Sequence, residues 1–476
     1  MKKLFHFIAK PGDIQISKEI LFLAYPVIIS NLSRVLMNIV DMGMVGHLGA
    51  NALAAVGMGS MLVWVFISMG ISLRTATQTL SSRRLGQRKF SECGTAFRNG
   101  FVMAIIFGCS ISVLGYMNTE RIVSYFMSDP NVIPMCNDYT SIGYLSVFFM
   151  VASFVFQGFY TGVERTKVHM VVTITSNIIN LYLNAGLIYG SEGLNNFFAN
   201  SSPLFSWMHV LWGWADFPEL GVKGAAIATL IASIWTFIHY CFFLFNKEIR
   251  NTFKIFKLKL DYTMMWRQFK LAFPQGLQEM VVTGGFAFFF KILGMIGTIE
   301  LATTEVVFTV MHASFMPAIG VGQACATLVG KYMGEGKLDI AEIAIWESVR
   351  WALIIMGTMG TIFILIPHLI LPLFTTDAEI IAYGINGLRI VGLIQYADAV
   401  AITLWFALSG AGNTVFPGMV DGILCWFFFL PGSYYFGVIK GFGFWGPWTF
   451  FGFYLILFAM IMYWKVKQGT WKTIQV

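Results

Sequence analysis

Acidic side chains stand inside long apolar segments of this 476-residue chain, where a charge is costly to hold. Asp41 lies in NIVDMGMVGHLG, Glu279 lies in FPQGLQEMVV, and Asp398 lies in GLIQYADAVAITLWFALSG beside Gln395 and Tyr396. An ionisable residue within a membrane-spanning helix costs about 2.5 to 3.5 kcal/mol on insertion scales. Residues of this kind are therefore candidates for binding ions or charged ligands.

Amide and hydroxyl oxygens elsewhere in the sequence could complete a cation site around Asp41. Asn180 and Asn184 are four residues apart in NIINLYLNAG and share one helical face, and Thr229 lies in GVKGAAIAT. Together with Asp41 they would make an oxygen-rich cluster that accepts a hard cation such as Na⁺, or a carboxylate that binds a proton. The structural alternative for Asp41 is an interfacial carboxylate that caps a neighbouring helix.

The other charged residues inside apolar segments differ in how strongly they indicate function. Asp398 lies deep in its segment and could bind a cationic substrate, a coupling ion, or both in turn. Glu279 is a further candidate, although it lies only about a turn into its segment. Lys291 is expected to extend its amine towards the membrane surface. Glu305 and His312, seven residues apart, share a face and fit either a packing role or a proton relay.

The composition requires helices in a membrane to hold these residues. The chain is 57% hydrophobic and 12% charged, whereas a soluble domain carries about a quarter charged residues, so a water-soluble protein is excluded. Twelve nearly uncharged stretches can each cross a hydrocarbon core of about 30 Å as a helix. Strands of a barrel would instead alternate over about ten residues. The predicted spans are 20–44, 53–80, 95–117, 139–162, 168–190, 221–245, 269–296, 300–329, 347–373, 380–409, 415–438 and 443–464.

The loop charges alternate along the chain and predict its orientation. Basic residues collect at both ends and in every second connection, including SSRRLGQRKF, GVERTKVH and NKEIRNTFKIFKLKL, whereas the other connections are acidic or neutral. The positive-inside rule then places both termini in the cytoplasm. The N-terminal stretch is expected to hold no removable signal peptide. The aromatic residues of 246–270 suit a helix lying at lipid headgroups rather than one that binds nucleic acid.

The two halves of the sequence are diverged copies of one unit. A shift of 248 residues without gaps pairs glycines, prolines and other residues across the chain: Pro26 with Pro274, Gly46 with Gly294, Gly86 with Gly334, and Gly162 with Gly410. We therefore predict two pseudo-symmetric six-helix lobes, residues 1–247 and 248–476, related by an axis along the membrane normal. An aromatic insertion at 191–217 interrupts the first copy. The paired prolines would bend their helices.

The sequence carries none of the catalytic motifs that a membrane enzyme or a nucleotide-driven pump would need. There is no GxxxxGK[ST], HExxH or GxSxG pattern, and no CxxC metal pair. We expect no cofactor and no enzymatic activity. The energy for any transport would then come from an ion gradient, since 100 mV supplies about 2.3 kcal/mol for each charge moved.

In combination, these features resemble the multidrug and toxic compound extrusion (MATE) family, in its bacterial NorM-like branch. The matching stretches are DMGMVGHLGANALAAVG (41–57), ELGVKGAAIAT (219–229), LAFPQGLQ (271–278) and DAVAITLWFALSGAGNT (398–414). The resemblance covers essentially the whole chain. It implies an all-α integral membrane fold of twelve helices in two lobes with a V shape, exporting mostly cationic, aromatic compounds in exchange for Na⁺ or H⁺.

The resemblance also assigns roles to residues of the first lobe. Asp41 is similar to the carboxylate that the family carries in its first span. Asn180, Asn184 and Thr229 are similar to the partners of that carboxylate in the cation site, where Na⁺ is the metal ion that would bind. This chain has Asn184 where many relatives have a second acid, which lowers the charge of the site.

In the second lobe, Asp398 matches the acid that precedes Gly410 at the spacing of the family. The acid that the family usually carries eight residues after the proline of span 7 is replaced by Val282. Glu279, one helical turn earlier on roughly the same face, is the candidate substitute, and with Asp398 it would bind substrate or a second cation.

The sequence therefore predicts a monomeric antiporter of the bacterial inner membrane, driven by Na⁺ or H⁺, that exports amphipathic organic cations. It would contact membrane lipid and no nucleic acid. The alternative is a flippase for a lipid or lipid-linked oligosaccharide. A flippase of that kind is expected to have a cationic cavity, whereas the charges within the spans are expected to be mainly acidic.

Overall fold

The computed structural model describes residues 12–127, 129–199, 210–212, 216–257, 260–375 and 377–475. This part of the chain is almost entirely helical and contains no strand. Twelve of its helical segments are long and apolar enough to cross a membrane, which confirms the predicted fold class and a multi-pass membrane protein. The N-terminal lysines Lys2, Lys3 and Lys10 lie outside the described residues, as do residues 200–209 and 213–215 of the aromatic insertion.

The six membrane-crossing segments of the first half are α2 (Ile14–Gly46), α3 (Ala50–Gly86), α4 (Phe90–Phe126), α5 (Ile133–Gly162), α6 (Thr166–Ala199) and α8 (Gly221–Leu244). The second half contains α10 (Tyr262–Ile296), α11 (Thr298–Gly334), α12 (Leu338–Leu365), α14 (Ala378–Gly410) and α17 (Trp445–Lys467). Its eleventh span is composite, with α15 (Val415–Leu424) and α16 (Leu430–Tyr434) separated and followed by π-helical turns η3 (Cys425–Phe429) and η4 (Tyr435–Ile439). The short elements are α9 (Lys247–Phe253), α13 (Pro367–Ile370), η2 (Leu371–Leu373) and η5 (Thr470–Thr473).

The first helix of each half begins at an aspartate in the same position of the repeat. The side chain of Asp13 accepts hydrogen bonds from the backbone nitrogens of Gln15 and Ile16, 2.7 and 3.1 Å away. Asp261, 248 residues later, accepts one from Met264 at 3.0 Å. Each aspartate satisfies amides that have no partner within the first turn of a helix. The repeat is therefore preserved in the capping residues of α2 and α10.

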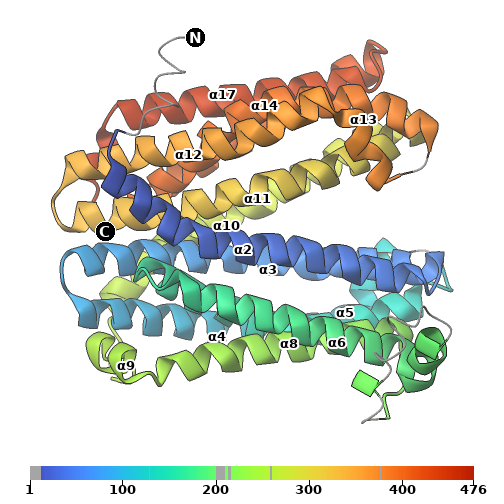
Figure 1. Ribbon diagram of the computed structural model, residues 1–476, viewed down its shortest axis with the longest axis horizontal. Helices are drawn as coiled ribbons and strands as arrows, with labels where there is room; N and C mark the ends of the chain where they lie inside the picture. The colour runs from blue at the N-terminus through green and yellow to red at the C-terminus, as the bar shows by residue number, and fades with distance from the viewer. Residues whose placement is uncertain are drawn as a thin grey trace.

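The helices form two bundles, with α2 and α10 running between them (Figure 1). We call the group α3, α4, α5, α6 and α8 with the second half of α2 the N-lobe. The C-lobe is α11, α12, α14, α15 to η4 and α17 with the second half of α10. The predicted boundary at residues 247 and 248 follows the sequence repeat and remains a proposal.

The first halves of α2 and α10 pack against the opposite lobe. Ile20 and Leu23 of α2 belong to a buried core made with α11, α12 and α14, whereas Leu271 and Ala272 of α10 belong to the core of the N-lobe. Both helices continue through their internal prolines. In Figure 1, α2 (dark blue) runs obliquely from the side of α12 towards α6. The lobes are thus tied together by two crossing helices.

Contacts between the lobes repeat with the same 248-residue shift. The Thr79 hydroxyl donates a hydrogen bond to the Ser409 carbonyl at 3.0 Å, and the Thr327 hydroxyl donates to the Thr161 carbonyl at 3.2 Å. In each pair the donor and acceptor exchange lobes, because Thr327 is the equivalent of Thr79 and Ser409 is the equivalent of Thr161. A pseudo-two-fold axis therefore passes between α3 and α11.

The same axis relates two glycines at which the backbones of α3 and α11 approach closely. A Cβ on Gly86 would lie 1.9 Å from the Lys331 carbonyl oxygen, and one on Gly334 would lie 2.2 Å from that of Arg83. Any side chain there would force the two helices apart. Lys331 also forms a 2.7 Å ion pair with Glu164 at this end of the molecule. We call this end, where both described termini lie, the closed end.

Candidate functional site

The Asp41 cluster is formed by α2 and α6, which pack side by side in the N-lobe. The Asn184 amide nitrogen donates to Asp41 Oδ1 at 2.6 Å and lies 3.3 Å from Asn180 Oδ1. Asn184 is 1% exposed and Asn180 is 7% exposed, whereas Asp41 is half-buried. The geometry thus brings together three of the four residues of the predicted cation site. Their role in cation binding remains a prediction.

An amide oxygen without a partner, beside the Asp41 carboxylate, distinguishes this cluster from a simple packing contact. Asn184 Oδ1 is buried and has no hydrogen-bond partner within the described part of the chain. Thr229, the fourth predicted residue, instead donates its hydroxyl to the Ala225 carbonyl of its own helix at 3.0 Å. Tyr139 of α5 lies within electrostatic range of Asp41 and was missed by the sequence analysis. A free amide oxygen beside a carboxylate is a pair of ligands that a hard cation prefers.

The C-lobe contains a second cluster, centred on a residue that the sequence analysis missed. Asp421 of α15 accepts a hydrogen bond from Gln278 Nε2 at 2.9 Å and another from the hydroxyl of Tyr454. Both Asp398 on α14 and Glu279 on α10 lie within electrostatic range of Asp421. Asp421 lies within the predicted span 415–438, so its charge in an apolar run was a usable signal.

The C-lobe carboxylates lie deep in the protein but remain accessible. Asp398, Asp421 and Glu279 are each densely surrounded by protein, yet each side chain is only partly buried. Adjacent carboxylates of this kind repel one another, so a cation that enters among them relieves the repulsion. The structure brings the two predicted C-lobe residues together with a third acid of the same charge.

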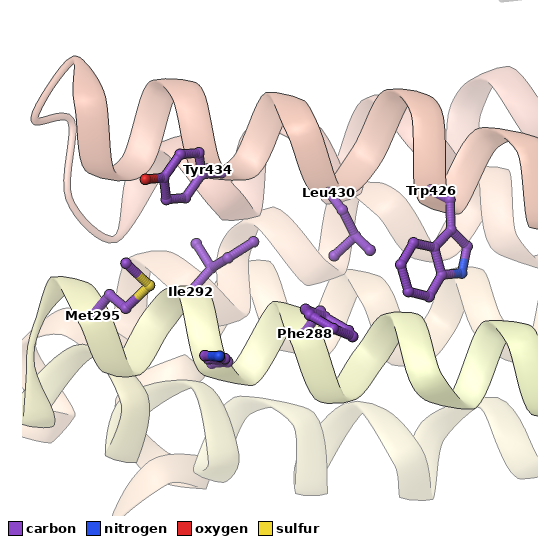
Figure 2. A pocket seen from close by; sticks show the side chains of 7 residues that line it. Phe288, Ile292, Met295, Trp426, Leu430 and Tyr434 are labelled. Carbon is purple, nitrogen blue, oxygen red and sulfur yellow. The ribbon is translucent and has the colours of Figure 1, made fainter.

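The remaining charged candidates lie outside both clusters. Glu305 and His312 are exposed, and no ion pair joins them among the described residues. Lys291 lines an apolar groove between α10 and the segment from α15 to η4, with Trp426 and Tyr434 on the opposite wall (Figure 2). Nothing in this geometry connects these three residues with Asp41 or Asp421.

Two arginines within the predicted spans also escaped the sequence analysis. Arg34 lies in α2 and Arg74 in α3, and they are close enough to repel each other. Arg74 also lies within electrostatic range of Glu279 across the boundary between the lobes. The expectation that charges within the spans are mainly acidic holds for the C-lobe site and is wrong for the N-lobe. A positive charge in an apolar run carries the same signal as a negative one.

Twelve spanning helices in two bundles define a multi-pass membrane protein, and the charged side chains held within them are typical of a transporter. The family model described as MatE matches the chain twice, at residues 26–185 and 274–434. The protein therefore belongs to the MATE family, whose members are transporters and not enzymes.

Curated relatives and a solved structure agree with this assignment. The chain is 25% identical over 433 residues to the "Probable multidrug resistance protein NorM" of Thermotoga maritima, covering 90% of this chain and 87% of the relative. It is 24% identical over 446 residues to the protein of the same name from Agrobacterium fabrum, with 92% and 90% covered. A structure described as the outward-facing conformation of a multidrug resistance MATE family transporter of the MOP superfamily aligns with a TM-score of 0.85. That alignment has 18% identity and covers 99% of this chain and 98% of the other, so it shows the fold.

Proposed function

We propose that this protein is a cation-coupled multidrug antiporter that exports amphipathic organic cations across the inner membrane. The names of its relatives, which are multidrug resistance proteins, and its membership of the MATE family support an efflux function. The single observation that carries the coupling is the contact of Asn184 with Asp41, which leaves a buried amide oxygen free beside a carboxylate. One Na⁺ or one proton would neutralise Asp41, and the amide oxygen would serve as a second ligand for Na⁺.

The Asp421 cluster would bind the cationic group of the substrate. Asp398, Glu279 and Asp421 come from three different helices of the C-lobe, so a bound cation would hold these helices together. Tyr454 and Gln278 fix the orientation of the Asp421 carboxylate. Because Asp41 and this cluster lie in different lobes, a movement of one lobe against the other could link ion binding to substrate release.

The closed end supports an outward-facing state with cytoplasmic termini. Basic residues collect there, including Arg84 in the last turn of α3 and Lys89 after it, and the positive-inside rule assigns such residues to the cytoplasm. The Lys331 to Glu164 ion pair and the glycine contacts hold the lobes together on that side. Opening towards the cytoplasm would need these contacts to separate, with α2 and α10 acting as the connecting elements.

A flippase for a lipid or lipid-linked oligosaccharide is the second candidate. The observation in its favour is the pair Arg34 and Arg74, a positive feature in the N-lobe that could bind a phosphate. The three carboxylates of the C-lobe oppose that reading, since they would repel a diphosphate that filled the space between the lobes. Export of organic cations accounts for more of the charged residues.

The coupling is tested with everted vesicles, a fluorescent organic cation, and Na⁺ and proton gradients imposed separately. We expect one gradient to drive transport and Asp41→Asn to abolish it, because the neutral amide no longer changes charge when an ion binds. Asp138→Asn, an exposed aspartate at the start of α5, is the matched control and should leave transport intact. Unimpaired gradient-driven transport by Asp41→Asn, at equal expression, would reject Asp41 as the coupling site.

A further inference from the structure

Arg34 and Arg74 form a pair of positive charges for which the N-lobe supplies no counter-ion. Arg74 is 9% exposed, and its Nε is buried without an acceptor. Throughout the part of the chain that the structure describes, neither guanidinium forms a hydrogen bond or an ion pair. Removing one charge from water costs several kcal/mol unless a partner compensates, and two arginines close together repel each other as well.

The polar groups behind the pair are already engaged with one another. His169 has its Nε2 3.0 Å from the Gln157 amide nitrogen and its Nδ1 2.7 Å from the hydroxyl of Tyr240. With Gln157 donating to Nε2, the ring is neutral and donates from Nδ1 to Tyr240. Tyr240 lies within electrostatic range of both arginines, but a neutral tyrosine and a neutral histidine supply no negative charge.

Neither Asp41 nor Glu279 forms an ion pair with the two arginines among the described residues. Asp41 is seven residues beyond Arg34 on the same helical face, which at 1.5 Å per residue is about 10 Å, and its Oδ1 accepts from Asn184. Glu279 interacts electrostatically with Arg74 but forms no ion pair with it among the described residues. The charges on the two lobes therefore face each other without making direct contact.

The terminal nitrogens of Arg74 and the guanidinium of Arg34 keep accessible surface. Only the Nε of Arg74 is both sealed from solvent and without a partner, so its two terminal nitrogens keep accessible surface while making no hydrogen bond. Arg34 is half-buried and has no sealed nitrogen. A planar guanidinium with free terminal nitrogens matches the two oxygens of a carboxylate or a phosphate.

The opposite charges of the two lobes are not inherited from the duplication. In the 248-residue register, Arg34 corresponds to Val282, Arg74 corresponds to Gly322, and Glu279 corresponds to Asn31. Each charge is thus present in one copy only, although the surrounding helices keep their symmetric contacts. The charged side chains that lie within electrostatic range across the lobe boundary are therefore arginines on the N-lobe side and carboxylates on the C-lobe side.

We propose that Arg34 and Arg74 form an anion-binding subsite, so that the preferred substrates are amphipathic zwitterions. The acidic group of the substrate binds the two arginines, and its basic group binds the carboxylates Glu279, Asp398 and Asp421. The inference rests on the proposed efflux function and narrows its substrate class. It assigns the arginines to substrate recognition, separate from the coupling ion at Asp41.

The test compares rhodamine B, whose free carboxylate makes it a zwitterion, with rhodamine B ethyl ester, which is a permanent cation of nearly the same shape. Binding to the full-length purified protein in detergent is followed by fluorescence anisotropy. We expect the zwitterion to bind at least about tenfold more tightly, which corresponds to about 1.4 kcal/mol. Equal affinity for acid and ester in the wild-type protein would overturn the proposal without any variant.

Substitutions then locate the subsite. Arg34→Gln and Arg74→Gln should each remove most of the preference for the acid while leaving affinity for the ester unchanged or improved, because the ester loses a repulsive neighbour. Arg74→Lys, which keeps the charge without the planar fork, should retain part of the preference. Arg121→Gln, an exposed arginine near the end of α4, is the matched control. Equal weakening of both dyes, or no change in either, would contradict the assignment.

Two further measurements distinguish loss of binding from misfolding, and a lipid ligand from a soluble one. Retained affinity for the ester reports that a variant is folded. A soluble short-chain phosphatidylethanolamine, also an amphipathic zwitterion, is added as competitor: displacement of rhodamine B supports a subsite that takes a lipid headgroup, and no displacement supports one for soluble compounds. Absence of gradient-driven transport of the ester in vesicles would reject the proposed function. The preference for the zwitterion would still be tested by the binding measurements, which do not depend on transport.

Discussion

The two lobes share one helical scaffold but hold side chains of opposite charge in their interiors. Their helices follow the same 248-residue register, begin α2 and α10 with the same capping aspartate, and meet through exchanged hydrogen bonds of Thr79 and Thr327. Their charged interiors differ completely, with Arg34 and Arg74 on one side and a carboxylate cluster on the other. Contacts that hold the lobes together have thus been preserved, while residues facing the space between them have diverged.

The comparison teaches which positions are constrained by packing and which are free to specialise. Gly86 and Gly334 remain glycine in both copies because a Cβ would strike the backbone of the facing helix. Val282 stands where the first copy has Arg34, and it is only half-buried. At these positions the tightly packed glycines keep the symmetry of the repeat, whereas the less buried position of Arg34 and Val282 does not.

The strongest way to break this asymmetry is to copy the N-lobe charge into the C-lobe. Val282→Arg places an arginine one helical turn after Glu279, where it would form an ion pair with that acid. We expect affinity for a purely cationic dye to fall about a hundredfold, or about 2.7 kcal/mol, in an anisotropy titration. Val282→Leu is the control for size, and an unchanged affinity in Val282→Arg would show that Glu279 and its neighbours do not bind the cation.

The symmetry of the closed end can be tested with its two glycines. Gly86→Ala and Gly334→Ala each introduce a Cβ that must push the facing backbone away, and overpacking of this kind costs about 1 to 3 kcal/mol. Both variants should unfold at lower temperature, by similar amounts, in a thermal denaturation assay in detergent. Gly57→Ala is the control, because a Cβ on Gly57 would have no atom within 4 Å. Gly336→Ala is unsuitable, because the φ of Gly336 is +76°. A loss of stability in only one of the two variants would contradict equivalent packing.

The smallest effect is expected from the exchanged hydrogen bonds. Thr79→Val and Thr327→Val each remove a hydroxyl that donates a hydrogen bond to the other lobe, at a cost of about 1 kcal/mol. Both variants should lower the midpoint of thermal unfolding, and Thr327→Val should lower it further, because the Thr327 hydroxyl also accepts a hydrogen bond from Gln78 Nε2 at 2.9 Å. Thr358→Val, whose exposed hydroxyl bonds only to its own helix, is the matched comparison. If both variants unfold at the same midpoint temperature as the wild-type protein, these hydrogen bonds do not stabilise the contact between the lobes.

The sequence was sufficient to predict the helices because a membrane leaves the backbone few choices. Apolar runs must close their hydrogen bonds internally, so each predicted span proved largely helical, although the span 347–373 is interrupted at Ile366 and the span 415–438 contains π-helical turns. The predicted ends were too short in places: span 53–80 belongs to α3, Ala50–Gly86, and span 95–117 belongs to α4, Phe90–Phe126. At 1.5 Å per residue, a helix of 37 residues is about 55 Å long and extends beyond the hydrocarbon core that hydropathy detects.

The candidate sites were only partly predictable. The contact of Asp41 with Asn184 follows from equivalent positions in related sequences, whereas Thr229 bonds within its own helix. Asp421, Arg34 and Arg74 had the same signal as Asp398, a charge within an apolar span. Their partners could not be read from the sequence, because hydropathy does not encode which helix faces which. The π-helical turns after Leu424 were likewise invisible to a pattern of apolar residues.

The exchange of α2 and α10 between the lobes has a consequence for how the protein is made. The core that surrounds Leu271 and Ala272 needs residues from both halves, so the N-terminal bundle stays incomplete until α10 has left the ribosome. The start of α2, the first spanning helix to be synthesised, must wait still longer, since the buried core that it joins also contains residues of α17. Neither half is an independent folding unit, and assembly in the bilayer ends only when the last helix arrives.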